Sequence, residues 1–187
     1  MGRETTKRLI AYAFKELLAE KPYNRITVND IAKKCDINRQ TFYYHFHDII
    51  ELIEWICESE VESSLKQIST YATWQEGYLT LFELIRKDKV IVTNIYRHTP
   101  YEYLTKYLYR VTYQILYNVV SEQAESMSIS KKDKEFIANF YKFGFVGLVT
   151  EWIDSDMAEN PEVIVNRLNT LIEGSVKNAL IRLTPIE

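Results

Sequence analysis

Few residues in this sequence can break a helix, and this scarcity restricts the fold more than any other feature. Only 5 Gly and 4 Pro occur among 187 residues. Between these breakers, apolar residues recur every three or four positions, which is the spacing of one helix face. A β sandwich of this length would need many more turn residues. The sequence therefore predicts an all-α fold of about nine helices: a first helix that ends before Pro22, then helices over about 28–34, 38–44, 48–69, 74–87, 89–97, 101–125, 132–154 and 161–182.

Charge is divided unevenly along the chain. The net charge is −3, yet residues 1–47 carry nine Lys and Arg against five Asp and Glu, while the remainder carries fourteen against twenty-one. A basic segment joined to an acidic body indicates that one face meets phosphate and the body does not. The two cysteines, Cys35 and Cys57, are too few for a disulfide framework or a zinc site, so we expect free thiols on apolar helix faces.

Several classes of protein are disfavoured by what the sequence lacks. It has neither an apolar signal-peptide core nor a run of about 18 apolar residues, so we expect a cytoplasmic protein with no membrane span. Only three histidines occur, and the sequence has no metal-ligand cluster, Gly-rich phosphate loop or nucleophile elbow. These features predict that the protein is not an enzyme and carries neither a cofactor nor a metal.

The segment from Thr27 to Phe46 has the pattern of two short helices joined by a tight turn. Thr27 is a suitable N-cap, with Asp30 three residues on as in a capping box. After a turn over residues 35–37, Asn38 caps the second helix. This arrangement allows the second helix to enter the major groove of DNA.

The second helix of this pair leaves polar side chains with little core to fill, because Phe42 and Phe46 face inward with Ile37. Arg pairs with guanine and Gln with adenine, whereas hydroxyl and imidazole groups contact phosphates and set the register. The first helix of this pair, which begins after Thr27, offers further N–H donors to phosphate at its start. An ordinary solvated face, and a structural role for His45, are the alternatives. The predicted DNA-binding residues are Thr27, Asn38, Arg39, Gln40, Thr41, Tyr43, Tyr44 and His45.

The segments ITVNDIA at 26–32 and INRQTFYYHF at 37–46 closely resemble the signature of TetR-family regulators. The resemblance covers residues 5–55 well and the remainder only by architecture. It implies a homodimer on an inverted repeat of double-stranded operator DNA. It also implies a helix-turn-helix domain at 1–47 and an effector-binding and dimerisation domain at 48–187, linked through the helix at about 48–69. The family's DNA-contacting positions correspond to Thr27, Arg39, Gln40, Thr41, Tyr43 and His45.

The sequence departs from the family pattern at three positions. Asp36 stands where the family usually has Gly, and Asp tolerates a left-handed turn better than most residues. Gln40 replaces a small residue and adds an amide that can read a base. Ile49 stands where Lys is frequent, which removes a phosphate contact at the start of the fourth helix.

The family resemblance implies a transcriptional repressor released by an unidentified effector. A weaker resemblance, carried by residues 39–43, 147–153 and 160–162 with Met157, is to the subgroup that contains activators of dihydroxyacetone kinase operons. It implies an activator switched by a kinase-like partner protein. A helical interaction module that binds no DNA is the remaining alternative.

The body contains two sets of apolar residues with open roles. Aromatic side chains between residues 74 and 117 could line an effector pocket or fill the core: Trp74, Tyr78, Phe82, Tyr96, Tyr103, Tyr107, Tyr113 and Tyr117. Apolar faces on the last two long helices could pack within one protomer or in an intermolecular four-helix bundle. Glycines on the first of them would allow close approach of another helix. The predicted dimer interface is Phe136, Phe140, Phe143, Gly144, Gly147, Leu148, Ile164, Leu168, Leu171 and Ile172.

Overall fold

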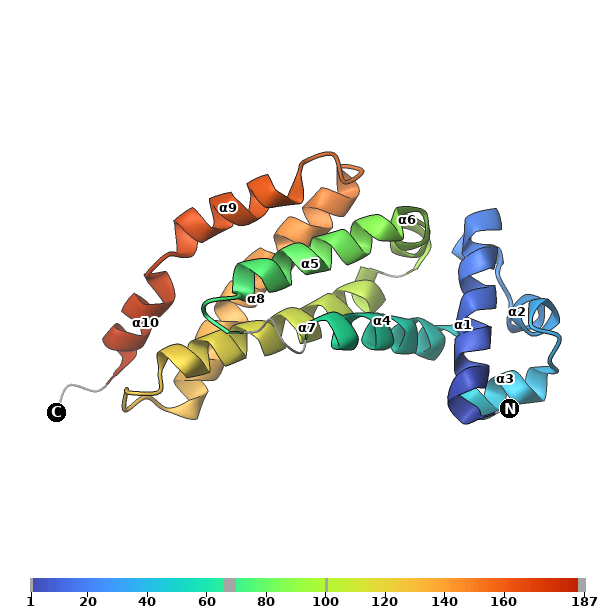
Figure 1. Ribbon diagram of the computed structural model, residues 1–187, viewed down its shortest axis with the longest axis horizontal. Coiled ribbons are helices and arrows are strands. Elements are labelled where there is room, and N and C mark those ends of the chain that lie inside the picture. The colour runs from blue at the N-terminus through green and yellow to red at the C-terminus, as the bar shows by residue number, and fades with distance from the viewer. Residues whose placement is uncertain (1, 66–69, 100, 185–187) are drawn as a thin grey trace. The chain divides into compact units, whose positions relative to one another are not determined.

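The computed structural model describes residues 2–65, 70–99 and 101–184, with backbone only for 60–65 and 101–104. Within these ranges the chain forms ten α-helices and one short 3-10 helix, and no strand (Figure 1). The predicted all-α class is confirmed. The elements are α1 (Arg3–Glu20), η1 (Tyr23–Arg25), α2 (Val28–Lys34), α3 (Arg39–His45), α4 (Ile49–Leu65), α5 (Trp74–Lys87), α6 (Lys89–His98), α7 (Tyr101–Gln123), α8 (Lys131–Asp154), α9 (Pro161–Ile172) and α10 (Ser175–Leu183).

One predicted helix, over residues 161–182, is two helices in the structure. Gly174 has a φ of +71° and separates α9 from α10. Glycine enters this left-handed region without the steric cost that a side chain adds, so it can end one helix and begin the next. The helix predicted over 48–69 is described as far as Leu65, and residues 66–69 lie outside the described part of the chain.

The chain divides into two compact units. Unit 1 contains residues 1–61 and 88–104, whereas unit 2 contains residues 62–87 and 105–187. Unit 1 therefore holds α1, α2, α3 and most of α4, together with α6 from further along the chain. The predicted domain boundary after residue 47 stays a prediction.

The core of unit 1 joins five helices of the unit. Phe14 of α1, Ile31 of α2, Phe42 of α3, Leu52 of α4 and Ile95 of α6 belong to one buried apolar cluster. Burial of an apolar side chain of this size contributes roughly 1.5–3 kcal/mol to stability. α6 is thus part of the core on which the helix-turn-helix rests.

The core of unit 2 is an aromatic cluster between α5 and α8. The ring centroid of Tyr78 lies 5.0 Å from Phe82 and 4.8 Å from Phe145, and Phe82 lies 4.8 Å from Trp152, all edge to face. The Tyr78 hydroxyl donates to the carbonyl oxygen of Phe145, and burial raises the pKa of Tyr78 far above its usual value. None of the described helices is both long and apolar enough to cross a membrane.

Candidate nucleic-acid interface

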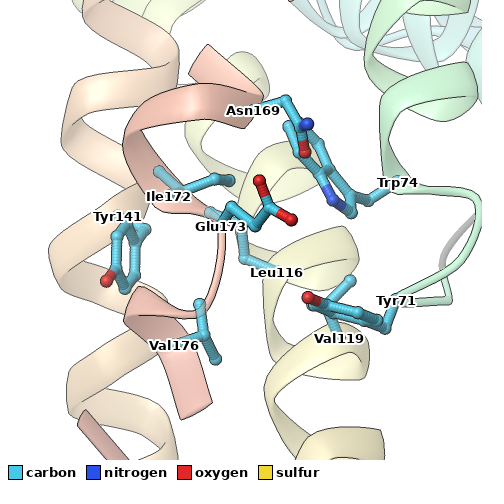
Figure 2. A pocket seen from close by; sticks show the side chains of 9 residues that line it. All are labelled: Tyr71, Trp74, Leu116, Val119, Tyr141, Asn169, Ile172, Glu173 and Val176. Atoms are coloured by element: carbon cyan, nitrogen blue, oxygen red, sulfur yellow. The ribbon is translucent and has the colours of Figure 1, made fainter. Parts of the chain in front are cut away.

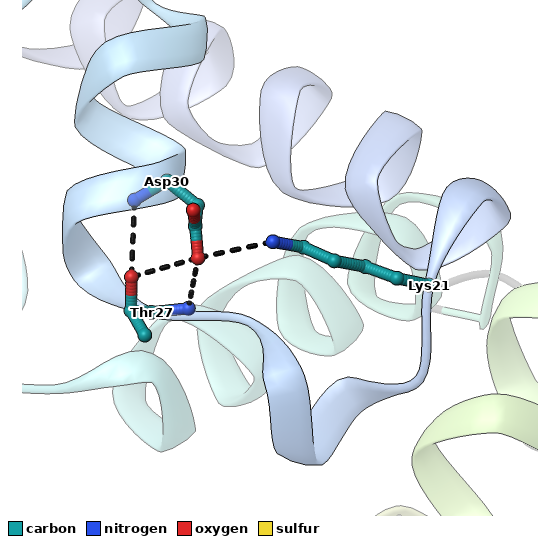
Figure 3. A network of polar contacts seen from close by, with 3 residues as sticks. All are labelled: Lys21, Thr27 and Asp30. Carbon is teal, nitrogen blue, oxygen red and sulfur yellow. Dashed lines mark hydrogen bonds and ion pairs between the residues drawn. The ribbon is translucent and has the colours of Figure 1, made fainter.

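The start of α2 is fixed by the predicted capping box, with a lysine added (Figure 3). The Asp30 carboxylate accepts from the Thr27 backbone N–H at 2.8 Å and from the Thr27 hydroxyl at 2.7 Å, while the Asp30 N–H donates to that hydroxyl oxygen at 3.2 Å. Lys21 Nζ lies 3.1 Å from the same carboxylate. These groups, the Thr27 hydroxyl first, lower the pKa of Asp30 to about 2. Thr27 thus fixes the entry into α2, and its predicted phosphate contact requires its hydroxyl to turn away from Asp30.

The turn between α2 and α3 has the backbone that the sequence predicts at Asp36. Its φ is +54°, in the left-handed region. The Ile37 N–H donates to the Ala32 carbonyl at 2.9 Å, and the Asp36 N–H donates to the Lys33 carbonyl at 3.3 Å. This pair of hydrogen bonds is the Schellman arrangement, which satisfies the last carbonyl groups of a helix. The turn therefore forms without the glycine that is usual in the family.

The start of α3 is held by Asn38. Its side-chain oxygen accepts from the Thr41 backbone N–H at 2.7 Å and from the Thr41 hydroxyl at 3.0 Å. On the inner side Phe42 and Phe46 are buried, as the sequence predicts. Asn38 and Thr41 thus fix the helix end that would enter a groove, and their predicted DNA contacts remain predictions.

The outer side of α3 presents side chains suited to contact with DNA. Arg39 and Gln40 are exposed, which confirms their predicted position, and Tyr44 is 71% exposed. The Arg39 guanidinium donates to the Tyr43 hydroxyl at 3.3 Å and lies 5.8 Å from the centre of its ring. The Arg3 guanidinium of α1 lies 5.9 Å from the Tyr44 ring. Arg39 thus lies against Tyr43, and a second cation, Arg3, lies against Tyr44.

His45 differs from these residues because it is buried. It is 8% exposed, and within the described structure its Nδ1 has no hydrogen-bond partner. Burial, and then the charges of Arg3 and Lys7, lower the pKa of its imidazole. A neutral ring packed edge-on against Tyr44 fits the structural alternative better than a phosphate contact.

Part of the positive charge of residues 1–47 is taken up by ion pairs. Lys34 lies 2.8 Å from Glu20 and 3.6 Å from Glu16, and Lys15 lies 2.6 Å from Asp88. The count of basic residues in the sequence therefore overstates the charge that is available to phosphate.

These features define the class of protein to which the chain belongs. A helix-turn-helix on a three-helix core, with Arg, Gln and Tyr exposed on its second helix, is the structure of a DNA-binding protein. Residues 10–55 match the family model described as bacterial regulatory proteins, tetR family, and residues 72–174 match the model described as transcriptional regulator C-terminal region (TetR_C_8). The second match covers more than half of the chain, which belongs to the TetR family of transcriptional regulators.

Known proteins with similar sequences are transcriptional regulators. The dhaKLM operon transcriptional activator DhaS of Lactococcus lactis is 34% identical over 91 residues, 49% of each chain. The uncharacterized regulator YxbF of Bacillus subtilis is 24% identical over 165 residues, 85% of this chain and 42% of YxbF. The matched region thus spans about half the length of these curated relatives.

Solved structures show the same fold. DhaS, described as a dihydroxyacetone kinase operon activator, superposes with a TM-score of 0.68 at 23% identity, over 96% of this chain and 98% of DhaS. NalD, the secondary repressor of the MexAB-OprM efflux pump in Pseudomonas aeruginosa, superposes with a TM-score of 0.64 at 14% identity, over 91% of this chain and 96% of NalD. At these identities the likeness concerns the fold alone.

The eight aromatic residues predicted as an effector pocket lie in different surroundings. Trp74, Tyr78 and Phe82 are packed in the unit 2 core, and Tyr107 is also buried. Tyr113 and Tyr117 are half-buried and stacked, with centroids 5.7 Å apart. Of the other two, Tyr96 belongs to unit 1, and the side chain of Tyr103 lies outside the described residues.

A small pocket in unit 2 includes one of these eight residues, Trp74 (Figure 2). Its volume is about 20 Å³, which holds one water molecule. Figure 2 shows Glu173 extending among apolar side chains, beside the break at Gly174. Glu173 was not among the residues predicted from the sequence, although a carboxylate next to a glycine in an apolar helix pattern is a visible signal. The lining residues are Tyr71, Trp74, Leu116, Val119, Tyr141, Asn169, Ile172, Glu173 and Val176.

Helix α8 has apolar residues on two opposite faces. One face, with Phe145, Val149 and Trp152, is buried in unit 2. On the other, Phe136 and Phe140 are each 67% exposed. A helix that is apolar all round is normally buried on all sides. The exposed face of α8 comprises Phe136, Phe140, Phe143, Gly144, Gly147 and Leu148.

The residues predicted as a dimer interface on α9 are divided between surface and core. Leu171 is 78% exposed, whereas Ile164 and Leu168 are buried inside the protomer. Ile172 is half-buried and lines the small pocket. At Gly144 and Gly147 of α8 an added Cβ would meet no atom within 4 Å, so both positions are open.

Proposed function

We propose that this regulator is a homodimer that binds an inverted-repeat operator, with one α3 helix in the major groove at each half-site. The observation that carries the proposal is the exposed polar face of α3 on a buried Phe42–Phe46 base. A two-fold dimer pairs two copies of this face, and two-fold symmetry in the protein requires a symmetric operator.

The residues of this face have separate roles in the proposal. Arg39 donates two hydrogen bonds to a guanine, and Gln40 bonds to an adenine. Tyr43, Tyr44 and Thr27 contact phosphates, which fix the register without reading sequence. Asn38 and Thr41 hold the N-terminus of α3 and contact DNA from there, while His45 supports the end of the helix from inside.

The second copy of the chain is expected to cover the exposed face of α8. Exposed apolar patches of this kind mark interaction sites, and the family usually forms dimers. Because Gly144 and Gly147 lack side chains on this face, a partner helix can approach α8 closely. Leu171 extends the interface on α9, whereas Ile164 and Leu168 contribute to it only by stabilising the protomer.

The regulation follows the family pattern in this proposal: the protein represses its operator and is released by an effector. NalD, a protein of similar fold, is described as a repressor. The second candidate is an activator switched by a kinase-like partner protein. The 34% identity with DhaS, which is described as an activator, favours it.

Selection of duplexes from a random-sequence library tests the proposal. The wild-type chain is expected to enrich an inverted repeat, and its affinity for that duplex should fall steeply with salt as counterions compete for the phosphates. A chain that enriches no sequence, or that binds every duplex equally, would contradict operator binding and favour an interaction module. A reporter gene downstream of the selected operator then separates the two candidates: expression falls with a repressor and rises with an activator.

A further inference from the structure

Within unit 1, the side chain of Asn94 on α6 makes three hydrogen bonds to the backbone between α1 and η1. Its amide nitrogen donates to the Leu18 carbonyl at 2.7 Å and to the Lys21 carbonyl at 2.9 Å. Its amide oxygen accepts from the Tyr23 backbone N–H at 2.8 Å. One half-buried side chain thus satisfies three backbone groups on the segment that leads from α1 to η1.

These three groups need a partner from outside their own helix. Leu18 lies in the last turn of α1, where carbonyl groups have no partner within the helix. A buried backbone group that is left without a partner destabilises the fold. Only an amide offers both donors and an acceptor in this geometry, because a carboxylate has no donor and an alkyl group has neither.

A second contact ties the beginning of α6 to the same helix. Asp88 is at the N-cap position of α6, but it makes no capping bond there. Its carboxylate instead lies 2.6 Å from Lys15 Nζ of α1, and both side chains are about three-quarters buried. Ile95, one turn along α6, is buried in the core of unit 1.

The Asn94 contacts continue into the helix-turn-helix. The carbonyl group of Lys21 is held by Asn94, and the ammonium group of Lys21 lies 3.1 Å from Asp30. Asp30 in turn closes the capping box with Thr27 at the start of α2. Two hydrogen bonds and one ion pair, linked through the side chain of Lys21, therefore connect α6 to the N-cap of α2 (Figure 3 shows the part from Lys21 onward).

The path of the chain places α6 between two of the crossings that join the units. The chain passes between the two units at residues 61–62, 87–88 and 104–105. The last two crossings flank the segment that contains α6, so the backbone joins α6 directly to elements of unit 2 at both ends. A site can influence a distant one only through an element whose equilibrium both sites affect.

We propose that Asn94 is a positioning residue for operator binding: it holds α6 against the backbone between Leu18 and Tyr23, so that docking of α6 and binding of the operator favour each other. The inference rests on the proposed function, because it requires an operator. Coupling is reciprocal, so the operator must stabilise the docked α6 as much as the docked α6 strengthens operator binding.

The test compares the wild-type chain with Asn94→Asp and Asn94→Ala. Asn94→Asp keeps the shape of the side chain and removes both donors. Asn169→Ala is the matched control, because the Asn169 side-chain oxygen accepts a hydrogen bond of 2.9 Å from the Gln75 side-chain amide, which joins two helices of unit 2. Asp88→Asn weakens the second contact and leaves Asn94 in place, in case the Asn94 variants fold poorly. Circular dichroism establishes that each variant is folded at the temperature used.

Two quantities are measured with the duplex that the wild type selects. Operator affinity should fall at least about fivefold in Asn94→Asp and less in Asp88→Asn, and stay unchanged in Asn169→Ala. Hydrogen exchange of residues 89–98 should slow when the wild type binds the duplex. In Asn94→Ala at a saturating concentration of duplex, exchange of residues 89–98 should no longer slow, whereas exchange in α3 should still slow. A residue that only stabilised the fold would leave the slowing in place.

The outcomes separate this inference from the proposed function. A wild type that selects no duplex would overturn both. A wild type that binds its operator, with a folded Asn94→Asp variant that binds equally tightly, would overturn the inference alone. So would exchange of residues 89–98 in the wild type that is indifferent to the duplex.

Discussion

Unit 1 and unit 2 use similar residues in opposite ways. In unit 1 the aromatic residues Phe42 and Phe46 are buried so that polar side chains of the same helix remain exposed. In unit 2 a helix with buried aromatic residues, α8, also exposes Phe136 and Phe140. The exposed face of unit 1 therefore suits a charged, hydrogen-bonding partner such as DNA, and the exposed face of unit 2 suits an apolar partner such as a second α8. The comparison shows that the exposed face of a helix, rather than its buried face, indicates what kind of partner the helix can contact.

The largest effect is expected from core truncations that test whether the two units are separate. Phe42→Ala in unit 1 and Phe82→Ala in unit 2 each remove a fully buried ring and should cost about 3–5 kcal/mol. Peptide-resolved hydrogen exchange should accelerate mainly in unit 1 for the first variant and mainly in unit 2 for the second. If both variants accelerated exchange along the whole chain, the two units would form one cooperative structure.

A somewhat smaller effect is expected at the exposed face of α8. Phe140→Asp would bury an unpaired charge in the dimer and should weaken it by about 3 kcal/mol or more. The matched control is Val90→Asp, which places the same charge at an exposed apolar residue of unit 1. Sedimentation should show monomers for Phe140→Asp and dimers for Val90→Asp. A Phe140→Asp variant that remained dimeric at low micromolar concentration would place the interface elsewhere.

A modest effect is expected where each unit contains a non-glycine residue with positive φ. Asp36 in unit 1 has a φ of +54° and Asp156 in unit 2 has a φ of +57°. Glycine avoids the steric cost of this conformation but is more flexible when unfolded, so Asp36→Gly and Asp156→Gly should each stabilise by about 0.5–1 kcal/mol. Urea denaturation gives the values. A loss of stability in either variant would show that the aspartate side chain has a further role in its turn.

The smallest effect concerns the pH dependence of the α2 cap. The pKa of Asp30 is lowered from 3.8 to about 2, chiefly by the Thr27 hydroxyl. A depressed pKa adds stability that is present above pH 3.8 and is lost as the pH falls towards 2. The stability difference between the wild type and Asp30→Asn should therefore shrink between these two values. An NMR titration in which the Asp30 carboxyl keeps its ordinary pKa would contradict the network in Figure 3.

Local signals made unit 1 more predictable than unit 2. Thr27, Asp36 and Asn38 each act on backbone within five residues, so caps and turn could be predicted from sequence. The hydrogen bonds of Asn94 could not be predicted in this way, because its partners lie more than seventy positions away in the sequence. The sequence alone also could not show that His45 is buried, since nothing in its neighbours distinguishes a phosphate contact from a packed ring.

In unit 2 the same apolar spacing is compatible with different structures. Leu168, Ile172, Val176 and Leu180 follow one another every four residues, which predicts one helix through Gly174, yet the backbone breaks there. The sequence left open whether Tyr78 lines a pocket or fills the core, and its packing on Phe145 places it in the core. Burial on one face or the other is a property of tertiary packing, which periodicity does not determine.

The most direct test of the account is the base preference of an Arg39→Ala variant on the selected operator. Binding is measured to the operator and to duplexes with each base pair of one half-site replaced in turn. The account predicts a loss of about 1–3 kcal/mol on the operator, with preference flattened at one base pair per half-site and retained at the others. Equal weakening of binding to every duplex would mean that Arg39 contacts a phosphate and reads no base. Unchanged affinity and base preference would contradict the assignment of α3 as the helix that reads DNA.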